Sequence, residues 1–599
     1  MRNLLTVYRH TFRLCWKVAP LSAVANVVLI ALMSGAAALT AASQRMLIDG
    51  AQTRTTVAIV AAAGLGVLAH AGTFILGHIQ GEVNQDLTVR VGREIDLEVL
   101  ALAASIPTLE HLERPDFLDR VTNLRRGTMM LARSVWSGAG LVGTAVSLGL
   151  SAWLLVGIHP ALPLLIGFAI PLLVLISRGN RHQRRVRDRT AENERHERSL
   201  HDLCVRAESA KELRIAGSGP ELSQRAMQLW DKTTGEIVRS RIHGAWLEAA
   251  GWLVMLAALG AALSLVLDLK DAGRATVGDV VLLITLTASL SGQIDRLVRS
   301  FSMVTDGGHV TGHYLWLKKY GATQANGSRP APRELVSGIS MRGVSFTYPG
   351  TSSPVLEHVD LDLPAGSTIA LVGLNGAGKT TMVKLLTGMY RPDAGTITVD
   401  GIPMADLEPR EWARRGAGVF QDFARLQFLI RENVGVGDLE RLDDTPAIES
   451  AITRAGADSV VASVPDRLQA QLGLLFQGAD LSHGQWQKLA LARGVMRRRP
   501  LLLVLDEPTS ALDPQAEHEL FERFTEQARD AAQAQGAITV IVSHRFSTVN
   551  MADLIVVIES GRVAEQGTHA HLLASAGRYA QLYRAQADAY SDTPPTTAN

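Results

Sequence analysis

Long apolar segments fill the first half of the chain and are nearly absent from the second half. A helix needs about 20 apolar residues to cross a hydrocarbon core roughly 30 Å thick. Five segments reach that length, and a sixth, 161–177, is shorter and is expected to continue as helix. Because almost no charge interrupts them, they predict membrane-spanning helices rather than buried helices of a soluble core. The six predicted spans are 18–42, 57–77, 135–158, 161–177, 245–267 and 277–297.

The connections between these spans alternate between short loops and long ones. The long loops, 78–134 and 178–244, keep helical character, with turns expected at 111–116 and 216–220. Positive charge marks the cytoplasmic side of a membrane protein, so the N-terminus and both long loops are expected in the cytoplasm. Part of the positive charge that supports this orientation precedes the first span. The rest is clustered in the second long loop, at Arg178, Arg181, Arg184, Arg185, Arg187 and Arg189.

Span 277–297 contains a mildly polar set of residues. Their alternating spacing does not follow one helical face, so only part of the set is expected to line a cavity, and helix packing is the simpler interpretation. The set consists of Thr285, Thr287, Ser289, Ser291 and Gln293.

A polar linker with glycine and proline, 321–337, separates the membrane segment 1–320 from a second domain. That domain is expected at 338–578, and the residues 579–599 are expected to form a tail. Its hydrophobic pattern changes to short apolar runs between polar loops, which is typical of an α/β fold.

Three largely apolar runs in this domain predict strands that are buried in a sheet. They are 367–373, 501–506 and 537–544, and each leads into a polar loop. Parallel strands that end in such loops place a ligand at the carboxyl edge of their sheet. Shorter antiparallel strands are expected at 396–399 and 554–563.

The first of these strands leads directly into a phosphate-binding loop. Residues 373–380 read GLNGAGKT, which fits the P-loop pattern G-x4-G-K-[ST]. The backbone amides and the lysine of such a loop cradle nucleotide phosphates, and the hydroxyl of Thr380 is expected to bind Mg²⁺. No Asn-Lys-x-Asp guanine motif is present, which favours ATP over GTP. The expected nucleotide-binding residues here are Gly373, Leu374, Asn375, Gly376, Ala377, Gly378, Lys379, Thr380 and Thr381.

Four polar residues after other strands are candidates for metal binding and catalysis. Asp506 ends an apolar run and is predicted to hold Mg²⁺. Glu507 can polarise the attacking water, and the context DEPTSALD favours this role over that of a structural acid. His544 ends the run 537–544 and can reach a γ-phosphate, although a lone histidine is more often structural. Gln421 is a weaker candidate for sensing Mg²⁺ or the γ-phosphate.

Two further segments carry candidate nucleotide contacts. Residues 481–485 read LSHGQ, and Ser482 with Gln485 has the form of a capping box, which would aim a helix N-terminus at an anion. His483 and Gly484 lie between them. Tyr348, at the end of a strand, can stack on adenine, although an aromatic residue at such a position more often serves packing.

Together these motifs resemble those of an ATP-binding-cassette (ABC) exporter half-transporter, over nearly the whole chain. The resemblance implies a polytopic α-helical membrane domain of six exporter-type transmembrane helices, fused to an α/β P-loop ABC ATPase domain. The tips 114–118 and 211–214 look most like the bacterial exporters of lantibiotics, other peptides and drugs. The order that matches the family's A-loop, Walker A, Q-loop, signature, Walker B, D-loop and H-loop is Tyr348, 373–380, Gln421, 481–485, Asp506 with Glu507, Asp513 and His544.

The resemblance also implies a dimer, in which two ATP molecules are held between the P-loop of one chain and the signature of the other. His483 replaces a glycine of the family signature, and its bulk either weakens a composite site or is tolerated. Because Glu507 and His544 are both kept, a competent homodimer is favoured and a heterodimer stays open.

The function implied is ATP-driven export of an amphipathic peptide or hydrophobic small molecule across the cytoplasmic membrane by alternating access. The alternatives are a lipid flippase, an exporter-fold siderophore importer and a regulatory ABC protein that transports nothing. Net charge is only +1, so no nucleic-acid partner is expected, and two distant cysteines suggest neither a disulfide framework nor a zinc site. The expected partners are a second half-transporter chain, membrane lipid and the substrate.

Overall fold

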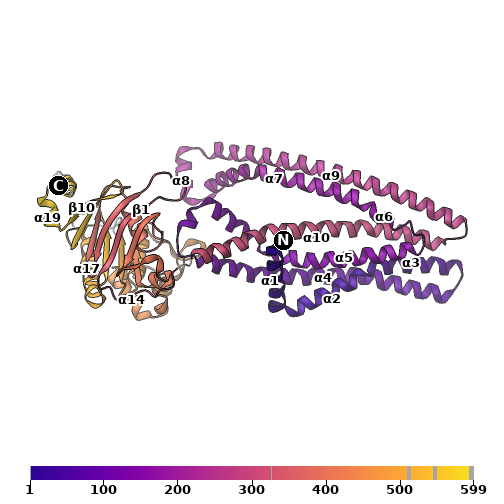
Figure 1. Cartoon of the computed structure of the whole chain (residues 1–599), viewed down its shortest axis with the longest axis horizontal. Helices are drawn as coiled ribbons and strands as arrows, with labels where there is room; N and C mark the ends of the chain where they lie inside the picture. Colours follow the sequence, from indigo (N-terminus) through magenta and orange to yellow (C-terminus); the bar gives the residue numbers. More distant parts are fainter. Residues whose placement is uncertain (1, 325–326, 509–513, 544–548, 592–599) are drawn as a thin grey trace. The chain divides into compact units, whose positions relative to one another are not determined.

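The computed structural model describes residues 2–324, 327–508, 514–543 and 549–591 (Figure 1). The chain divides into two compact units. One unit is helical and consists of Met1–Leu100 and Thr122–Trp316, and the other combines Ala101–Val121 with Leu317–Asn599. The turn between the second and third spans therefore belongs to the same unit as the α/β domain.

Six helices of the described chain are long and apolar enough to cross a membrane, which confirms the predicted number. The first is formed by α2 and α3 and extends to Gln52, ten residues beyond the predicted end at 42. The fourth is interrupted at Phe168 and then continues as α7, as predicted for the short span. The helices of this part of the chain are α1 (Arg2–Val18), α2 (Pro20–Ser34), α3 (Ala36–Gln52), α4 (Thr56–Ala104), α5 (Pro115–Val156), α6 (Leu164–Gly167), α7 (Ala169–Val205), α8 (Ala207–Ala216), α9 (Gly219–Asp271) and α10 (Val277–Gln324).

The helices α7 and α9 run side by side for most of their length (Figure 1). Small residues make this close approach possible, because a Cβ on Gly179 would lie 3.2 Å from the Cα of Gly244. Farther along the pair, a Cβ on Gly251 would lie 2.6 Å from a methyl group of Leu172. Glycine at helix crossings lets backbones approach in a setting where lipid offers no hydrophobic driving force.

Both long loops turn back where the sequence predicts it. In the first, the 3₁₀ turn Glu110–Glu113 precedes α5, and the N–H of Leu109 donates to the carbonyl of Met389, 2.8 Å away in the α/β domain. In the second, α8 is followed directly by Gly217, whose φ of 62° is the left-handed conformation typical of the residue after a helix, and α9 begins at Gly219.

The α/β domain contains a six-stranded sheet that carries the predicted apolar runs. Its order is β10-β9-β3-β8-β7-β6, and all neighbours are parallel except β10 and β9. The antiparallel prediction for 554–563 is therefore wrong for its first half: β9 pairs in parallel with β3, because it is apolar and buried, and only β10 returns antiparallel. The strands are β3 (Thr368–Val372), β6 (Gly416–Val419), β7 (Leu502–Asp506), β8 (Ile538–Val542), β9 (Leu554–Glu559) and β10 (Arg562–Gly567).

A four-stranded antiparallel sheet, β2-β1-β4-β5, lies in the same domain and includes the predicted strand at 396–399. Its strands are β1 (Gly338–Phe346), β2 (Leu356–Pro364), β4 (Ala394–Val399) and β5 (Ile402–Pro403). Tyr579 is fully buried against a cluster that includes Ile555 and Val557 of β9, so the start of the last helix packs on the sheet. The helices are α11 (Lys379–Leu386), α12 (Pro409–Arg415), α13 (Ile430–Gly435), α14 (Thr445–Arg454), α15 (Asp458–Ala462), α16 (His483–Gly494), α17 (Pro514–Gln535), α19 (His569–Ala574) and α20 (Arg578–Ser591).

Candidate active site

The P-loop connects the end of β3 to the start of α11. Two of its glycines are required by the backbone: Gly376 has φ of 81° and Gly378 has φ of 108°, and Gly378 is the residue directly before α11. A Cβ on Gly378 would also collide with the side chain of Leu356, 2.6 Å away. The loop therefore brings backbone N–H groups and the N-terminus of α11 together, which is the arrangement that binds phosphate.

Lys379 is the cation of this loop. Its Nζ donates to the carbonyl oxygens of Gly373 (2.9 Å) and Leu374 (3.0 Å), and the residue is only 6% exposed. Burial lowers its pKa, and the nearby carboxylates of Glu507 and Asp506 act in the opposite direction. A buried ammonium with only neutral oxygens as hydrogen-bond partners is a favourable site for a phosphate.

Asp506 ends β7 beside the P-loop helix. Thr380 Oγ1 donates to its Oδ1 at 3.4 Å, and its Oδ2 is buried with no hydrogen-bond partner among the described residues. Burial raises the pKa of Asp506, since an ionised carboxylate is poorly solvated there.

These two side chains fit a bound Mg²⁺. A buried carboxylate oxygen without a partner and an adjacent hydroxyl are the hard oxygen ligands that this ion prefers. No cluster of three His, Cys, Asp or Glu that could hold a metal occurs in the described part of the chain. The remaining ligands would therefore be water and nucleotide phosphates, as is usual for Mg²⁺.

Glu507 follows Asp506 with an unusual backbone. Its φ is 46°, and its N–H donates to the carbonyl of Val542 at 3.0 Å, which ties it to the end of β8. A left-handed conformation costs a residue with a side chain roughly 1–2 kcal/mol, and such strain is concentrated at functional sites.

The parallel strands bring several predicted residues to one edge of the sheet. β3, β8, β7 and β6 are consecutive neighbours, so the P-loop, Asp506, Glu507 and Gln421 all lie at or just after strand ends on that edge. Gln421 is exposed. Two predicted residues, Asp513 and His544, lie outside the described residues.

Tyr348 lies close to the P-loop helix but has packing partners. Its hydroxyl is 3.1 Å from Thr381 Oγ1. Its ring makes edge contacts with Phe346 and Tyr390, at centroid distances of 5.1 and 5.5 Å. The packing alternative thus has direct support, and stacking on adenine remains a prediction.

The segment 481–485 begins α16 as the capping box predicts. Ser482 Oγ accepts from the N–H of Gln485 (3.3 Å), and Gln485 Oε1 accepts from the N–H of Ser482 (2.8 Å). His483 is exposed in the first turn, 3.0 Å from Arg425 Nη2 and beside the ring of Phe423. These two neighbours come from a loop about 60 residues earlier, and no local signal in the sequence indicates them.

The helical unit contains a cavity of about 400 Å³ between α2, α3, α4, α5 and α10. From the polar set of the last span, Thr285, Ser289 and Ser291 line it. Gln293 is fully buried and its Nε2 donates to Ser151 Oγ at 3.4 Å, so part of the set serves helix packing, as expected.

Polar residues outside this set also line the cavity, and no pattern in the sequence indicates them. They include His70 and Gln80 of α4 and Arg296 of α10. No acidic residue is present among the described residues of the lining, and Arg296 makes no hydrogen bond or ion pair with any described residue.

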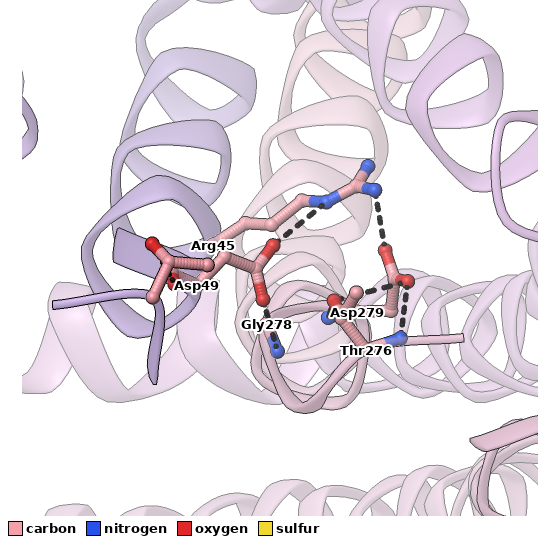
Figure 2. A network of polar contacts seen from close by, with 6 residues as sticks. Arg45, Asp49, Thr276, Gly278 and Asp279 are labelled. Atoms are coloured by element: carbon pink, nitrogen blue, oxygen red, sulfur yellow. Dashed lines mark hydrogen bonds and ion pairs between the residues drawn. The ribbon is translucent and has the colours of Figure 1, made fainter. Parts of the chain in front are cut away.

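A polar network joins the end of α3 to the start of α10 (Figure 2). Arg45 forms ion pairs with Asp279 (2.9 Å) and Asp49 (3.7 Å). Asp279 accepts from the N–H and hydroxyl of Thr276, which caps α10, and Asp49 accepts from the N–H of Gly278 at 3.1 Å. Carboxylates from both helices thus accept hydrogen bonds from N–H groups at the start of α10, where the helix itself supplies no acceptor.

Comparisons with known proteins agree with this architecture. The profile of the ABC transporter family matches residues 356–510. The chain is 32% identical over 312 residues to the subtilin transport ATP-binding protein SpaT of Bacillus subtilis, covering 52% of this chain and 50% of SpaT. It is 36% identical over 331 residues to the ATP-dependent lipid A-core flippase of Pseudomonas fluorescens, covering 55% and 53%. The chain thus spans about half the length of these curated relatives.

A solved structure described as a bacterial Atm1-family ABC exporter with ATP bound is similar in fold, with a TM-score of 0.76. The match covers 94% of this chain and 98% of that one, at 22% sequence identity. The chain thus shares the fold of that structure, and its residues 356–510 match the ABC transporter family.

Proposed function

We propose that this chain is one half of a dimeric ABC exporter. It uses ATP hydrolysis to move an amphipathic peptide or hydrophobic small molecule across the cytoplasmic membrane by alternating access. The observation that supports the proposal is that a P-loop with a buried Lys379, beside Thr380 and Asp506, lies on the same chain as six membrane-length helices. The N-terminus and the ATPase domain are proposed to be cytoplasmic, because arginines cluster in the second long loop.

The chain's own residues would act on ATP as follows. Lys379 and the P-loop amides would hold the phosphates, and Thr380 with Asp506 would hold Mg²⁺, which neutralises phosphate charge during transfer. Glu507 would accept a proton from the attacking water. Gln421 and His544 would contact the γ-phosphate side of the site, and Tyr348 would contact the adenine.

A second copy of the chain would complete each site. The N-terminus of α16, with Ser482, His483, Gly484 and Gln485, would approach ATP held by the other chain. ATP would then favour the closed dimer by its differential affinity for that state, which is how a ligand shifts a conformational equilibrium. A homodimer is favoured because the chain carries its own P-loop, Glu507 and capped signature helix.

The cavity lined by Thr285, Ser289 and Ser291 is the proposed passage for the substrate. Its mixture of hydroxyl groups and apolar walls suits an amphipathic molecule. A lipid flippase is the second candidate, because several relatives of the chain are lipid A-core flippases.

The test is reconstitution of the purified chain in liposomes. ATP-dependent uptake of a fluorescent amphipathic peptide into inside-out vesicles supports export, whereas ATP-dependent movement of a labelled lipid between leaflets supports the flippase. Glu507→Gln is the control, because it should keep ATP affinity and nearly abolish hydrolysis. Hydrolysis by this variant at the wild-type rate would remove Glu507 from its assigned role, and ATP turnover without any transport would favour a regulatory protein.

A further inference from the structure

A second cavity of the helical unit lies where the apolar part of α7 changes into its arginine-rich part. Its volume is about 480 Å³, and its walls come from α5, α7 and α10. Five of its lining residues are apolar: Leu141, Leu173, Leu297, Val298 and Phe301. Phe301 is 62% exposed, although it is a large aromatic residue. This part of the cavity offers hydrocarbon-like surface that the described chain leaves uncovered.

The other part of the same cavity is polar, and it lies farther along both helices. On α7, Arg181 follows Leu173 by eight residues, which corresponds to about 12 Å along the helix axis. On α10, Ser302 and Thr305 follow Leu297 and Val298 in the same way. The cavity is therefore amphipathic along the direction of the helices.

Two guanidinium groups line the polar part, and they differ in their partners. Arg184 pairs with Asp306 (3.0 Å) and donates to Ser302 Oγ (3.0 Å), so its charge is neutralised within the protein. Arg181 is exposed and forms no hydrogen bond or ion pair with any described residue. Asn180, next to it, also lines the cavity. One unpaired positive charge thus remains beside an amide that can donate hydrogen bonds.

We propose that this cavity binds an anionic phospholipid. The phosphate would contact Arg181 and Asn180, and an acyl chain would lie against Leu173, Val298 and Phe301. A guanidinium matches a phosphate in geometry, and basic pockets between membrane helices favour anionic head groups. The single unpaired charge matches the single negative charge of a phosphodiester, and the cavity lies at the level where apolar residues end, which is where head groups lie.

The site is distinct from the proposed substrate passage. None of its lining residues belongs to the lining of the cavity between α2, α3, α4, α5 and α10. Lipid binding can therefore be tested without any transport or ATPase measurement, and the result does not depend on whether the proposed function is correct.

The experiment places the purified full-length chain in nanodiscs of mixed phosphatidylcholine and phosphatidylglycerol and measures the retained lipids by native mass spectrometry. The expected result is preferential retention of phosphatidylglycerol, weakened about tenfold by Arg181→Gln, since the variant loses one charge-assisted phosphate contact. Arg187→Gln is the matched control: it removes the same charge from the same helix, at an exposed position outside the cavity lining. It should retain phosphatidylglycerol as the wild type does.

Phe301→Ala tests the acyl half of the site. Because Phe301 is largely exposed, its removal should leave the fold intact and still weaken retention of the lipid. Equal losses in Arg181→Gln and Arg187→Gln would overturn the proposal, because they indicate diffuse attraction to the arginine cluster. Unchanged retention in Arg181→Gln would also overturn it. Displacement of the lipid by millimolar inorganic phosphate would show an anion site without lipid specificity and would refute the acyl contact.

Discussion

The ion pair between Arg45 and Asp279 provides the sharpest test of how the membrane helices hold together (Figure 2). Arg45→Met keeps most of the side-chain volume and removes the charge. The side chain of Asp279 is only 6% exposed, so the variant leaves a nearly buried carboxylate with Thr276 as its remaining hydrogen-bond partner. Removing one partner of a buried pair costs about 3–5 kcal/mol. Because Arg45 is itself 36% exposed, we expect a smaller cost, about 2–3 kcal/mol.

The assay is thermal unfolding of the purified chain in detergent, followed by intrinsic fluorescence. A loss of about 2–3 kcal/mol corresponds to a decrease in Tm of about 3–6 °C for a domain as large as the helical unit. The matched control is Arg225→Met, because Arg225 pairs with Glu221 on the surface of α9, where both side chains are about 60% exposed. An exposed pair of this kind is worth roughly 0.3–0.5 kcal/mol, so the control should shift Tm by less than about 1 °C.

A double-mutant cycle isolates the pair itself. Asp279→Asn should destabilise the protein in the wild-type background, because it breaks the ion pair. In the Arg45→Met background it removes an unpaired buried charge, so it should lower the stability much less or raise it. Equal Tm shifts for Arg45→Met and Arg225→Met, together with additive effects in the cycle, would refute the reasoning. In that case water would have to solvate Asp279 in spite of its burial.

Three further predictions concern the ATP site and the membrane orientation. Burial raises the pKa of Asp506 in the folded domain above the value of about 4 that an unfolded aspartate has. The nucleotide-free domain should therefore lose stability as the pH rises from about 4 through the folded-state pKa. Asp506→Asn should remove this pH dependence of stability and should stabilise the fold at neutral pH by about 1 kcal/mol, which raises the Tm. The same variant should abolish Mg²⁺-dependent ATP hydrolysis. A Tm below that of the wild type would contradict this prediction. His483→Gly should raise the ATPase rate of a homodimer, because it restores close backbone approach at the start of α16; a rate that changes only with a second half-transporter present would indicate a heterodimer. Cysteines at Gln52 and Asp271, in a cysteine-free background, should react with a membrane-impermeant thiol reagent in intact cells, and a cysteine at Ser218 should not; labelling at Ser218 would reverse the orientation.

Much of the architecture was predictable because its signals are local in the sequence. A run of about 20 apolar residues needs no partner to identify it as a span, so all six spans were found, although the first extends ten residues beyond its expected end. The P-loop was equally clear, since its glycines meet backbone requirements that arise within eight residues. The capping box of Ser482 and Gln485 likewise depends on positions three residues apart.

Other features were decided only by tertiary structure, because they depend on residues from different elements. Strand β9 ends in a hairpin that favours an antiparallel assignment, yet its buried apolar side chains place it in parallel beside β3. The period of the polar set in α10 could not show that Thr285 faces the cavity while Gln293 packs against Ser151 of α5.

Charge partners follow the same rule. The sequence alone establishes the count and clustering of arginines, and therefore the expected orientation in the membrane. It does not show that Arg45 and Arg184 are neutralised by carboxylates far along the chain, whereas Arg181 and Arg296 have no such partner among the described residues. Pairing requires two side chains to meet within about 4 Å, and only the packing of the helices brings such groups together.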